Sequence, residues 1–175
     1  MPNGLALAIS LLIVLMFLAY IVSVILAFFS PYYSTPKREV EDILRNFKLK
    51  KEDRFADLGS GDGRMVFGVN KRYGCLSVGY EISPILLMIV KLKKLFFHPF
   101  NSKIQFKEES FFNTKLSDYT VIYCYLPEDI LGALEKKFDK ELKKGTQVFL
   151  LKSTLQGKRG EKIKVGNRIL YRYTY

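Results

Sequence analysis

A glycine-rich turn directly after a short apolar run contains residue types that suit a small-molecule site. In "FADLGSGDGR", residues 55–64, Gly59, Gly61 and Gly63 alternate with Ser60 and Asp62. Because glycine has no side chain, such a turn brings backbone N–H groups close to a ligand, and open α/β sheets bind ligands at the carboxyl ends of their strands. The sequence therefore predicts a ligand site at residues 59–63.

Acidic residues around this turn indicate the charge of the ligand. Dinucleotide sites carry G-x-G-x-x-G and place a pyrophosphate at a helix N-terminus. Here the glycines follow G-x-G-x-G, and Asp57 and Asp62 lie where phosphates would bind. A ligand with positive charge is favoured instead, such as S-adenosylmethionine with its sulfonium and ammonium groups. Glu81 supports this interpretation, because it ends the next predicted strand, 22 residues after Gly59. At this place a carboxylate accepts hydrogen bonds from the hydroxyls of a ribose.

Strands and helices are expected to alternate around the turn. We expect strands at 54–58, 76–81, 103–107, 120–126 and 146–152, and helices at 64–73, 84–97 and 128–142. An amphipathic helix capped by Thr35 is expected before the first strand, with one buried face of Val40, Ile43, Leu44 and Phe47. Such alternation predicts an α/β, Rossmann-like parallel sheet with helices on both faces. The tail, "EKIKVGNRILYRYTY", predicts a C-terminal antiparallel hairpin around Gly166-Asn167.

The N-terminal part of the chain has the pattern of a transmembrane helix. Leu5 to Phe29 is a run of 25 residues interrupted only by Ser10, Tyr20 and Ser23, and a bilayer core needs about 20 helical residues. The basic start and the cleavage site of a secretory signal are missing. Basic residues follow the run from Lys37 onward, which places the next domain on the cytoplasmic side or in an equivalent compartment such as a matrix. We expect a single-pass anchor over 1–30, a linker and amphipathic helix over 31–52, and a ligand-binding domain over 53–175.

The chain carries a net charge of +11, and all 28 Lys and Arg residues follow Pro36. A basic surface attracts RNA as readily as anionic lipid. Lipid is favoured and nucleic acid is disfavoured, because the short segment 30–36 keeps the domain beside phospholipid head groups. The two cysteines, Cys75 and Cys124, lie in apolar strand-like segments without metal-type spacing, so we expect buried free thiols and no metal site.

The chain resembles the class I, seven-strand S-adenosylmethionine-dependent methyltransferases in "DRFADLGSGDGRMVF" and "VGYEISP". More narrowly, "PYYSTPKREVEDIL" and "LSDYTVIYCYLPEDILGALEKKFDKELKKGTQV" are similar to membrane-anchored protein-lysine methyltransferases related to those of the ATP synthase c subunit and the adenine nucleotide translocase. The resemblance implies a minimal methyltransferase domain over 53–175 that modifies a lysine of a protein at or in the membrane. The cofactor-binding residues that it implies are Asp57, Gly59, Ser60, Gly61, Asp62, Gly63, Glu81, Glu109, Ser110 and Phe111.

Within this set, the glycine turn and its acids are assigned to the methionine part of the cofactor, and Glu81 to the ribose. The residues after the third strand are assigned to adenine. There the chain departs from the pattern, because Glu109-Ser110 precedes two phenylalanines where relatives have Gly-Asp before a bulky pair.

The segment "YCYLPED" after the fourth predicted strand is expected to border the acceptor. Tyr125 and carbonyls near Leu126 would orient an amine, and Glu128 would assist its loss of a proton. Similar enzymes that methylate planar amino groups carry Asn/Asp-Pro-Pro-aromatic at this place, which argues against a nucleic-acid base as acceptor. Strand packing is an equally good explanation for Tyr123 and Tyr125.

The predicted helix at 84–97 is apolar on two sides. We expect one face to cover the sheet, and it consists of Ile85, Met88, Ile89, Leu92, Leu95 and Phe96. The second face, Leu86, Val90 and Phe97, would contact lipid, a hydrophobic substrate or the N-terminal segments. Two alternatives therefore stay open: methylation of a lipid or small hydrophobic molecule, and a non-catalytic S-adenosylmethionine-binding module. The latter is favoured by the lack of room for a last crossover helix between Lys152 and Glu161.

Overall fold

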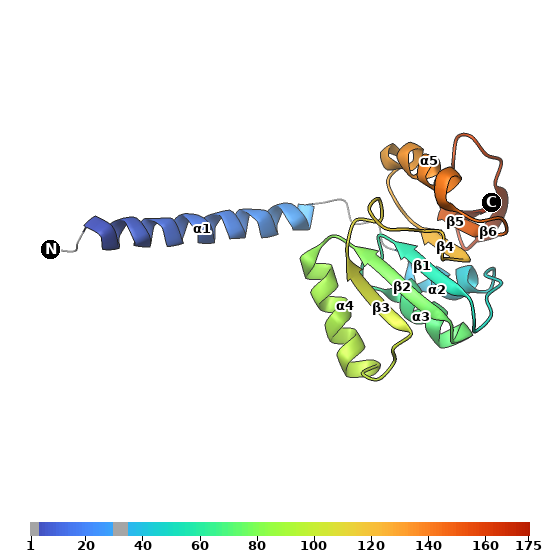
Figure 1. Ribbon diagram of the computed structural model, residues 1–175, viewed down its shortest axis with the longest axis horizontal. Coiled ribbons are helices and arrows are strands. Elements are labelled where there is room, and N and C mark those ends of the chain that lie inside the picture. The colour runs from blue at the N-terminus through green and yellow to red at the C-terminus, as the bar shows by residue number, and fades with distance from the viewer. Residues whose placement is uncertain (1–3, 30–34) are drawn as a thin grey trace. The chain divides into compact units, whose positions relative to one another are not determined.

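The computed structural model describes residues 4–29 and 35–175 of a chain that divides into two compact units, Met1–Tyr32 and Tyr33–Tyr175 (Figure 1). The first unit contains the helix α1, Gly4–Phe29, which is long and apolar enough to cross a membrane over Gly4–Val22. Residues 1–3 and 30 of the predicted anchor and residues 31–34 of the predicted linker lie outside the described residues. The domain boundaries given above stay predictions.

The second unit is built on a seven-stranded sheet of order β3-β2-β1-β4-β5-β7-β6. The strands are β1 Arg54–Leu58, β2 Leu76–Glu81, β3 Ile104–Glu108, β4 Val121–Cys124, β5 Gln147–Leu151, β6 Glu161–Val165 and β7 Arg168–Thr174. β1 to β5 are parallel, and β7 runs antiparallel to both β5 and β6. The predicted Rossmann-like sheet and its antiparallel C-terminal hairpin are confirmed.

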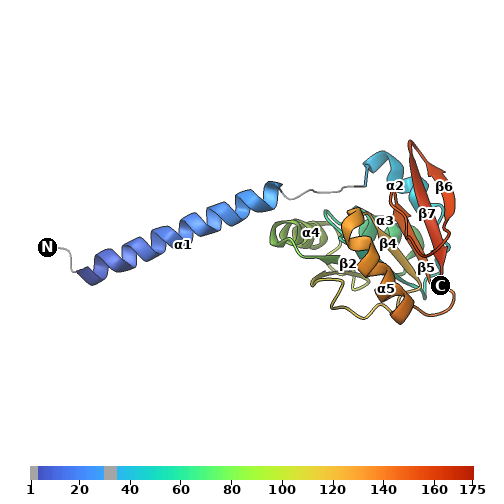
Figure 2. The same cartoon turned by 90° about the horizontal axis from the view of Figure 1, so that it is seen from above.

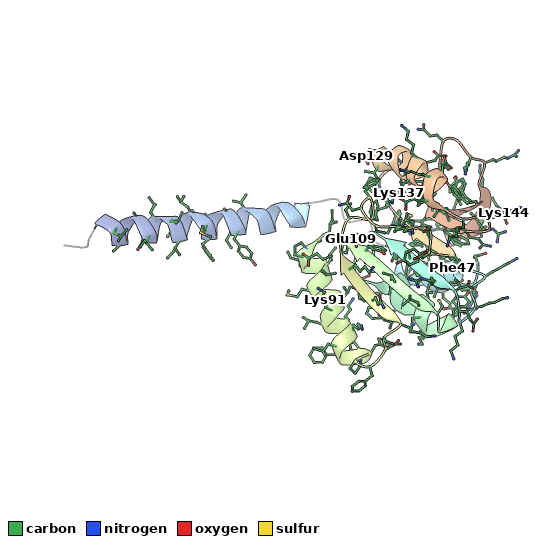
Figure 3. The ribbon with its side chains drawn as sticks, in the orientation of Figure 1. Phe47, Lys91, Glu109, Asp129, Lys137 and Lys144 are labelled. Carbon is green, nitrogen blue, oxygen red and sulfur yellow. The ribbon has the colours of Figure 1, made fainter. Side chains whose placement is uncertain are left out.

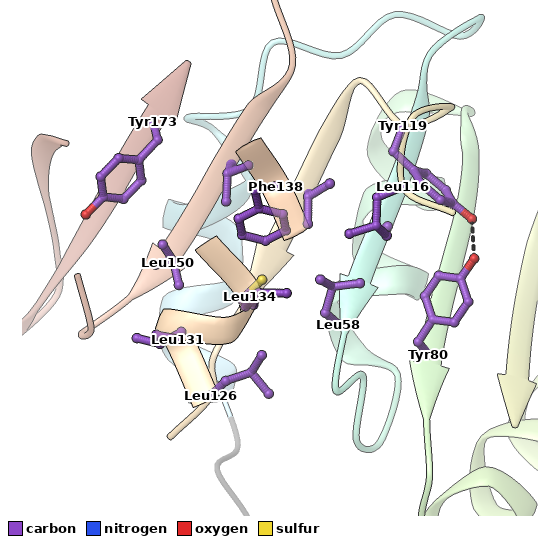
Figure 4. Close-up of a cluster of buried hydrophobic side chains, with 14 of the residues drawn as sticks. Leu58, Tyr80, Leu116, Tyr119, Leu126, Leu131, Leu134, Phe138, Leu150 and Tyr173 are labelled. Carbon is purple, nitrogen blue, oxygen red and sulfur yellow. Dashed lines mark hydrogen bonds between the residues drawn. The ribbon is translucent and has the colours of Figure 1, made fainter. Parts of the chain in front are cut away.

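Helices cover both faces of the sheet (Figure 2). They are α2 Lys37–Leu44, α3 Arg64–Tyr73, α4 Pro84–Phe97 and α5 Leu131–Glu141, with the 3₁₀ turn η1 Glu128–Ile130 before α5. α2 and α3 cover one face, where Phe55 lies in a cluster of buried side chains. α5 covers the opposite face and packs Leu134 and Phe138 near Leu58 (Figure 4). Because β1 is buried from both sides, its carboxyl end and the turn that follows are held in place.

Local signals set the helix boundaries beside the turn. α3 ends before Gly74, whose φ of +64° is the left-handed conformation common after a helix C-terminus. Ser83 Oγ accepts a hydrogen bond from Leu86 N at 3.5 Å, and Pro84 stands in the first turn of α4. The predicted Thr35 cap is wrong. Because Pro36 takes the N-cap position, the Thr35 hydroxyl lies one residue too early and instead shares a 2.7 Å hydrogen bond with the Tyr123 hydroxyl.

Other predicted elements differ from the structure mainly at their ends. β3 is shifted by one residue, and β4 stops at Cys124 because its ladder with β1 ends where β1 turns at Gly59. The helix predicted at 128–142 starts as the separate turn η1. Between residues 35 and 175, all of which are described, no α-helix connects β3 to β4 or β5 to β6. The connection after β5 agrees with the absence of a last crossover helix.

α4 turns a different face to the sheet from the one predicted. Its buried side chains are Leu87 and Val90, whereas most of the expected covering face is exposed, including Met88 and Leu92. The apolar pattern could not fix this rotation, because both sides of the helix are apolar. A polar contact accompanies the observed rotation: Lys93 Nζ donates a hydrogen bond to the backbone carbonyl of Asp62 at 3.2 Å.

Candidate functional site

The glycine turn between β1 and α3 is held against the end of β2. Gly59 N and Ser60 N both donate to the carbonyl of Tyr80, at 3.0 and 2.9 Å. Gly59 has a φ of +77°, and a Cβ added there would lie 2.8 Å from Leu126 Cδ2. Glycine is therefore needed for the backbone conformation and for the close approach of the chain after β4. The turn and "YCYLPED" are therefore neighbours in the structure.

Three carboxylates gather around this turn: Asp57 at the end of β1, Asp62 within the turn and Glu81 at the end of β2. Asp57 is 3% exposed. Burial raises the pKa of its carboxyl well above the ordinary value, and the negative charges of Glu81 and Asp62 raise it further. No described residue donates a hydrogen bond to the Asp57 side chain. A positively charged ligand beside Asp57 would therefore favour the ionised form of its carboxyl.

Glu81 is tied to the backbone through both of its oxygens. Oε2 accepts from Gly61 N at 2.9 Å, and Oε1 accepts from Ile82 N and Ser83 N, each at 2.9 Å. A carboxylate has about four lone-pair sites, so these contacts leave capacity for a ligand hydroxyl. Glu81 thus connects the turn after β1 to the start of α4.

Asp62 is bound by basic residues in the structure. Arg64 Nε and Nη2 donate to Asp62 Oδ1 and Oδ2, each at 2.7 Å, and Lys93 Nζ lies 3.6 Å from Oδ2. Burial raises the pKa of Asp62, but the hydrogen bonds and charge of Arg64 and the charge of Lys93 outweigh burial and lower it. Arg64 Nη1 also donates to the carbonyl of Thr35. Sequence reasoning missed Arg64 and Lys93; the Asp62-x-Arg64 spacing at the start of the helix is the signal that was available for Arg64.

Ser60 has a polar atom that the protein leaves unpaired. Its Oγ is buried and has no hydrogen-bond partner among the described residues. A Cβ added at Gly79 on β2 would lie 2.6 Å from this oxygen, so glycine at 79 makes room for the turn. An unpaired hydroxyl, a bare turn and carboxylates without enough cations fit a ligand with hydroxyls and positive charge. The site fits S-adenosylmethionine by these criteria.

The predicted adenine segment follows β3 at the same edge of the sheet, since Glu81 pairs in register with Glu108. Glu109, labelled in Figure 3, and Ser110 are half-buried. Ser110 makes local turn contacts, accepting from Phe112 N at 3.4 Å through Oγ. Phe111 packs at the border of the cluster under α5. The structure therefore brings the segment to the site, and its contact with adenine stays a prediction.

The predicted acceptor residues differ in their surroundings. Tyr123 is buried, burial raises the pKa of its hydroxyl well above the ordinary value, and the hydroxyl contacts Thr35, so strand packing explains Tyr123. Tyr125 is half-buried beyond the end of β4, and Glu128 is exposed in η1. The carbonyl of Leu126 accepts a 3.4 Å hydrogen bond from the buried Ser153 Oγ. Catalytic roles for Tyr125 and Glu128 stay predictions.

Lys152, just beyond the end of β5, is a residue that sequence reasoning did not single out. Its φ is +76°, a left-handed conformation that costs a non-glycine residue about 1–2 kcal/mol. The next residue is Ser153, which reaches the carbonyl of Leu126. Such strain is common at functional sites. Its backbone N–H donates to the carbonyl of Ile169 on β7 at 2.8 Å, a long-range contact that the residue pattern does not signal.

Comparison with known proteins identifies relatives of this chain. Residues 57–159 match the model of the family described as "ANTKMT methyltransferase domain". The chain is 29% identical over 130 residues to a protein-lysine N-methyltransferase of Saccharolobus islandicus, covering 73% of this chain and 79% of that protein. It is 27% identical over 122 residues to the adenine nucleotide translocase lysine N-methyltransferase of Mus musculus, covering 67% of this chain and 51% of that protein.

A solved structure shares the fold over most of the chain. It is an RNA methyltransferase from Salinibacter ruber in complex with S-adenosyl-L-homocysteine, with a TM-score of 0.75 and 26% sequence identity. The match covers 81% of this chain and 93% of that one. The chain spans about half the length of the mouse relative.

Proposed function

The chain belongs to the ANTKMT methyltransferase domain family and is an S-adenosylmethionine-dependent methyltransferase, and we propose that its acceptor is a lysine side chain of a protein in or beside a membrane. The observation that carries the cofactor assignment is the cluster of Asp57 and Glu81 at the glycine turn, next to the chain after β4. The names of the Saccharolobus and mouse relatives support lysine as the acceptor.

Bound S-adenosylmethionine supplies a methyl group that its sulfonium has already activated. The protein therefore has to position the reactants and exclude water. We assign Asp57 to the positive charge of the methionine part and Glu81 to the ribose hydroxyls. The backbone bonds of Glu81 would hold its carboxylate in one orientation before the cofactor arrives.

The residues after β4 are assigned to the acceptor amine. A lysine has an ordinary pKa of about 10.4, and it must lose a proton before its nitrogen can attack. Removal from water favours the neutral amine. We assign Tyr125 to orient the nitrogen and Glu128 to take the proton, and Ser153 holds the neighbouring Leu126 carbonyl through its 3.4 Å hydrogen bond.

We further propose that α1 spans a membrane once and that the second unit lies on the cytoplasmic or matrix-equivalent side. The length and apolar character of α1 support the span. The basic residues that follow it, beginning with Lys37 and Arg38, support the orientation.

A labelling experiment tests the acceptor. Membranes that contain the full chain would be incubated with S-adenosylmethionine carrying a labelled methyl group, with Asp57→Asn membranes as the matched control. Label recovered as acid-stable methyl-lysine, and absent from the control, is the expected result. Label in the lipid extract or in RNA would overturn lysine as the acceptor, and no label above the control would favour a non-catalytic binding module.

A further inference from the structure

The exposed apolar side chains of the second unit are concentrated on α4 and its flanks. Ten large apolar side chains are exposed among the described residues 35–175, and eight of them lie between residues 82 and 100. These eight are Ile82, Met88, Ile89, Leu92, Leu95, Phe96, Phe97 and Phe100, and we call them the α4 ridge. Large exposed apolar patches mark interaction sites rather than ordinary surface.

Five members of the ridge lie along one side of the helix, and the other three, Ile82, Phe97 and Phe100, lie at or beyond its ends. Met88, Leu92 and Leu95 follow one another at the spacing of neighbours on a helix face, and Phe96 extends the line. Leu92 is 46% exposed and Phe96 is 75% exposed. An apolar groove of about 370 Å³ adjoins this side, between α4 and the end of β3. The sheet thus covers only the opposite side of α4, the side of Leu87 and Val90.

Most of the charge near the ridge is positive, although Glu108 lines the groove beside it. Between Glu81 and Glu108 the chain contains no acidic residue but five lysines: Lys91, Lys93, Lys94, Lys103 and Lys107. Lys91 is exposed at one border of the ridge (Figure 3), and Lys93 lies at the other border, where it contacts Asp62. An apolar helix face bordered by lysines is typical of helices that lie in the interface of an anionic bilayer, with the lysine amines at the head groups.

We propose that the α4 ridge inserts into the boundary between head groups and acyl chains of an anionic bilayer, as a second membrane contact besides α1. This inference rests on the membrane anchoring proposed above. The seven residues 30–36 between α1 and α2 span at most about 25 Å when fully extended, so an anchored chain keeps its second unit close to the bilayer surface. Since α4 begins three residues after Glu81, the insertion holds the ribose end of the cofactor site beside the head groups. That position selects acceptor lysines at the membrane surface.

The absence of tryptophan from the sequence provides a clean test. Phe96→Trp places a single fluorescent reporter on the ridge, and Lys136→Trp places one on the exposed side of α5 as the matched control. Each full-length variant would be reconstituted at one copy per nanodisc, in phosphatidylcholine with phosphatidylglycerol, with and without brominated acyl chains.

We expect bromine to remove roughly half of the emission of the Phe96→Trp variant, because interfacial helices bury their apolar face about 5–10 Å deep. The Lys136→Trp variant should be unaffected, and adding Leu92→Glu to Phe96→Trp should restore its emission. Equal, weak quenching of both reporters would overturn the proposal. A blue-shifted but unquenched Phe96→Trp emission would also overturn it, since protein rather than lipid would then cover the ridge.

Flotation of the same chain with vesicles separates the two membrane proposals. A chain that does not float contradicts the anchoring by α1 and removes the basis of this inference. A chain that floats and shows no quenching of the Phe96→Trp reporter contradicts only the insertion of α4.

Discussion

The carboxylate of Glu81 accepts a hydrogen bond from the backbone N–H of Gly61 at 2.9 Å, so the acid at the end of β2 holds the middle of the turn after β1. The residue assigned to the ribose is therefore also part of the structure of the turn. A substitution at 81 that keeps the size of the side chain tests its charge with least disturbance of the turn.

Glu81→Gln should weaken the binding of S-adenosylmethionine about 10- to 100-fold, because a hydrogen bond to a charged group is worth about 1.5–3 kcal/mol. In the variant, one of the two carboxylate oxygens is replaced by an amide NH₂ group, a donor that faces a backbone N–H donor. Calorimetric titration measures the effect. Glu52→Gln, at an exposed glutamate, should bind as the wild type does, and equal affinities of all three proteins would contradict the assignment.

Asp57 should make the stability of the ligand-free protein depend on pH. Its raised pKa means that the folded state holds this proton more tightly than the unfolded chain does. The resulting stabilisation is fully present below the unfolded value of 3.8 and is lost as pH rises through the folded pKa. Asp57→Asn removes this titration. As pH rises from 3.8 through the folded pKa, thermal unfolding should therefore show the variant gaining stability relative to the wild type. The gain should be about 1.4 kcal/mol for each tenfold difference in proton affinity between the folded and unfolded states. A difference in stability between the two proteins that stays constant over this pH range would contradict the prediction.

Cofactor binding should release the same proton. Positive charge on the ligand favours ionised Asp57, so the affinity for S-adenosylmethionine should rise with pH over the same window. Calorimetry in two buffers with different ionisation enthalpies counts the protons released. Asp57→Asn should show none, and no release from the wild type would exclude Asp57 as the residue that receives the cationic group.

Gly59→Ala and Gly145→Ala form a matched pair. Both glycines have positive φ, at +77° and +93°, so each substitution should cost about 1–2 kcal/mol in the free energy of unfolding. Only at Gly59 would the new Cβ meet another residue, at 2.8 Å from Leu126; at Gly145 nothing lies within 4 Å. We expect Gly59→Ala to reduce cofactor binding at least tenfold, as about 1.4 kcal/mol of lost binding energy would, and Gly145→Ala to leave it unchanged. Loss of binding in both variants would point to a general loss of stability.

The sequence predicted those parts of the fold that depend on local patterns. Apolar runs and glycine or serine boundaries located β1, α3, β2 and α4 at the residues where the structure has them. The sequence could not predict the features that depend on long-range contacts. The rotation of α4 accompanies the contact between Lys93 and Asp62, the bond of Thr35 to Tyr123 crosses 88 residues, and the strain at Lys152 arises where β5 ends. The acids around the turn were recognisable from their chemistry, whereas the pairing of Asp62 with Arg64 required the folded geometry.

Tyr125→Phe and Glu128→Gln should separate catalysis from cofactor binding. Both residues lie on the chain after β4, which contacts the turn through Leu126 but supplies none of the clustered carboxylates. If Tyr125 orients the amine and Glu128 takes its proton, each variant should lower kcat about 100-fold, the lower end of the range for general acid–base catalysis. The Kd for S-adenosylmethionine should not change.

Single-turnover methylation of membranes gives the rate and calorimetry gives the affinity. The control is Asp129→Asn, at the exposed acid next to Glu128. Full activity of Glu128→Gln, together with a slow Tyr125→Phe, would mean that solvent rather than Glu128 receives the proton.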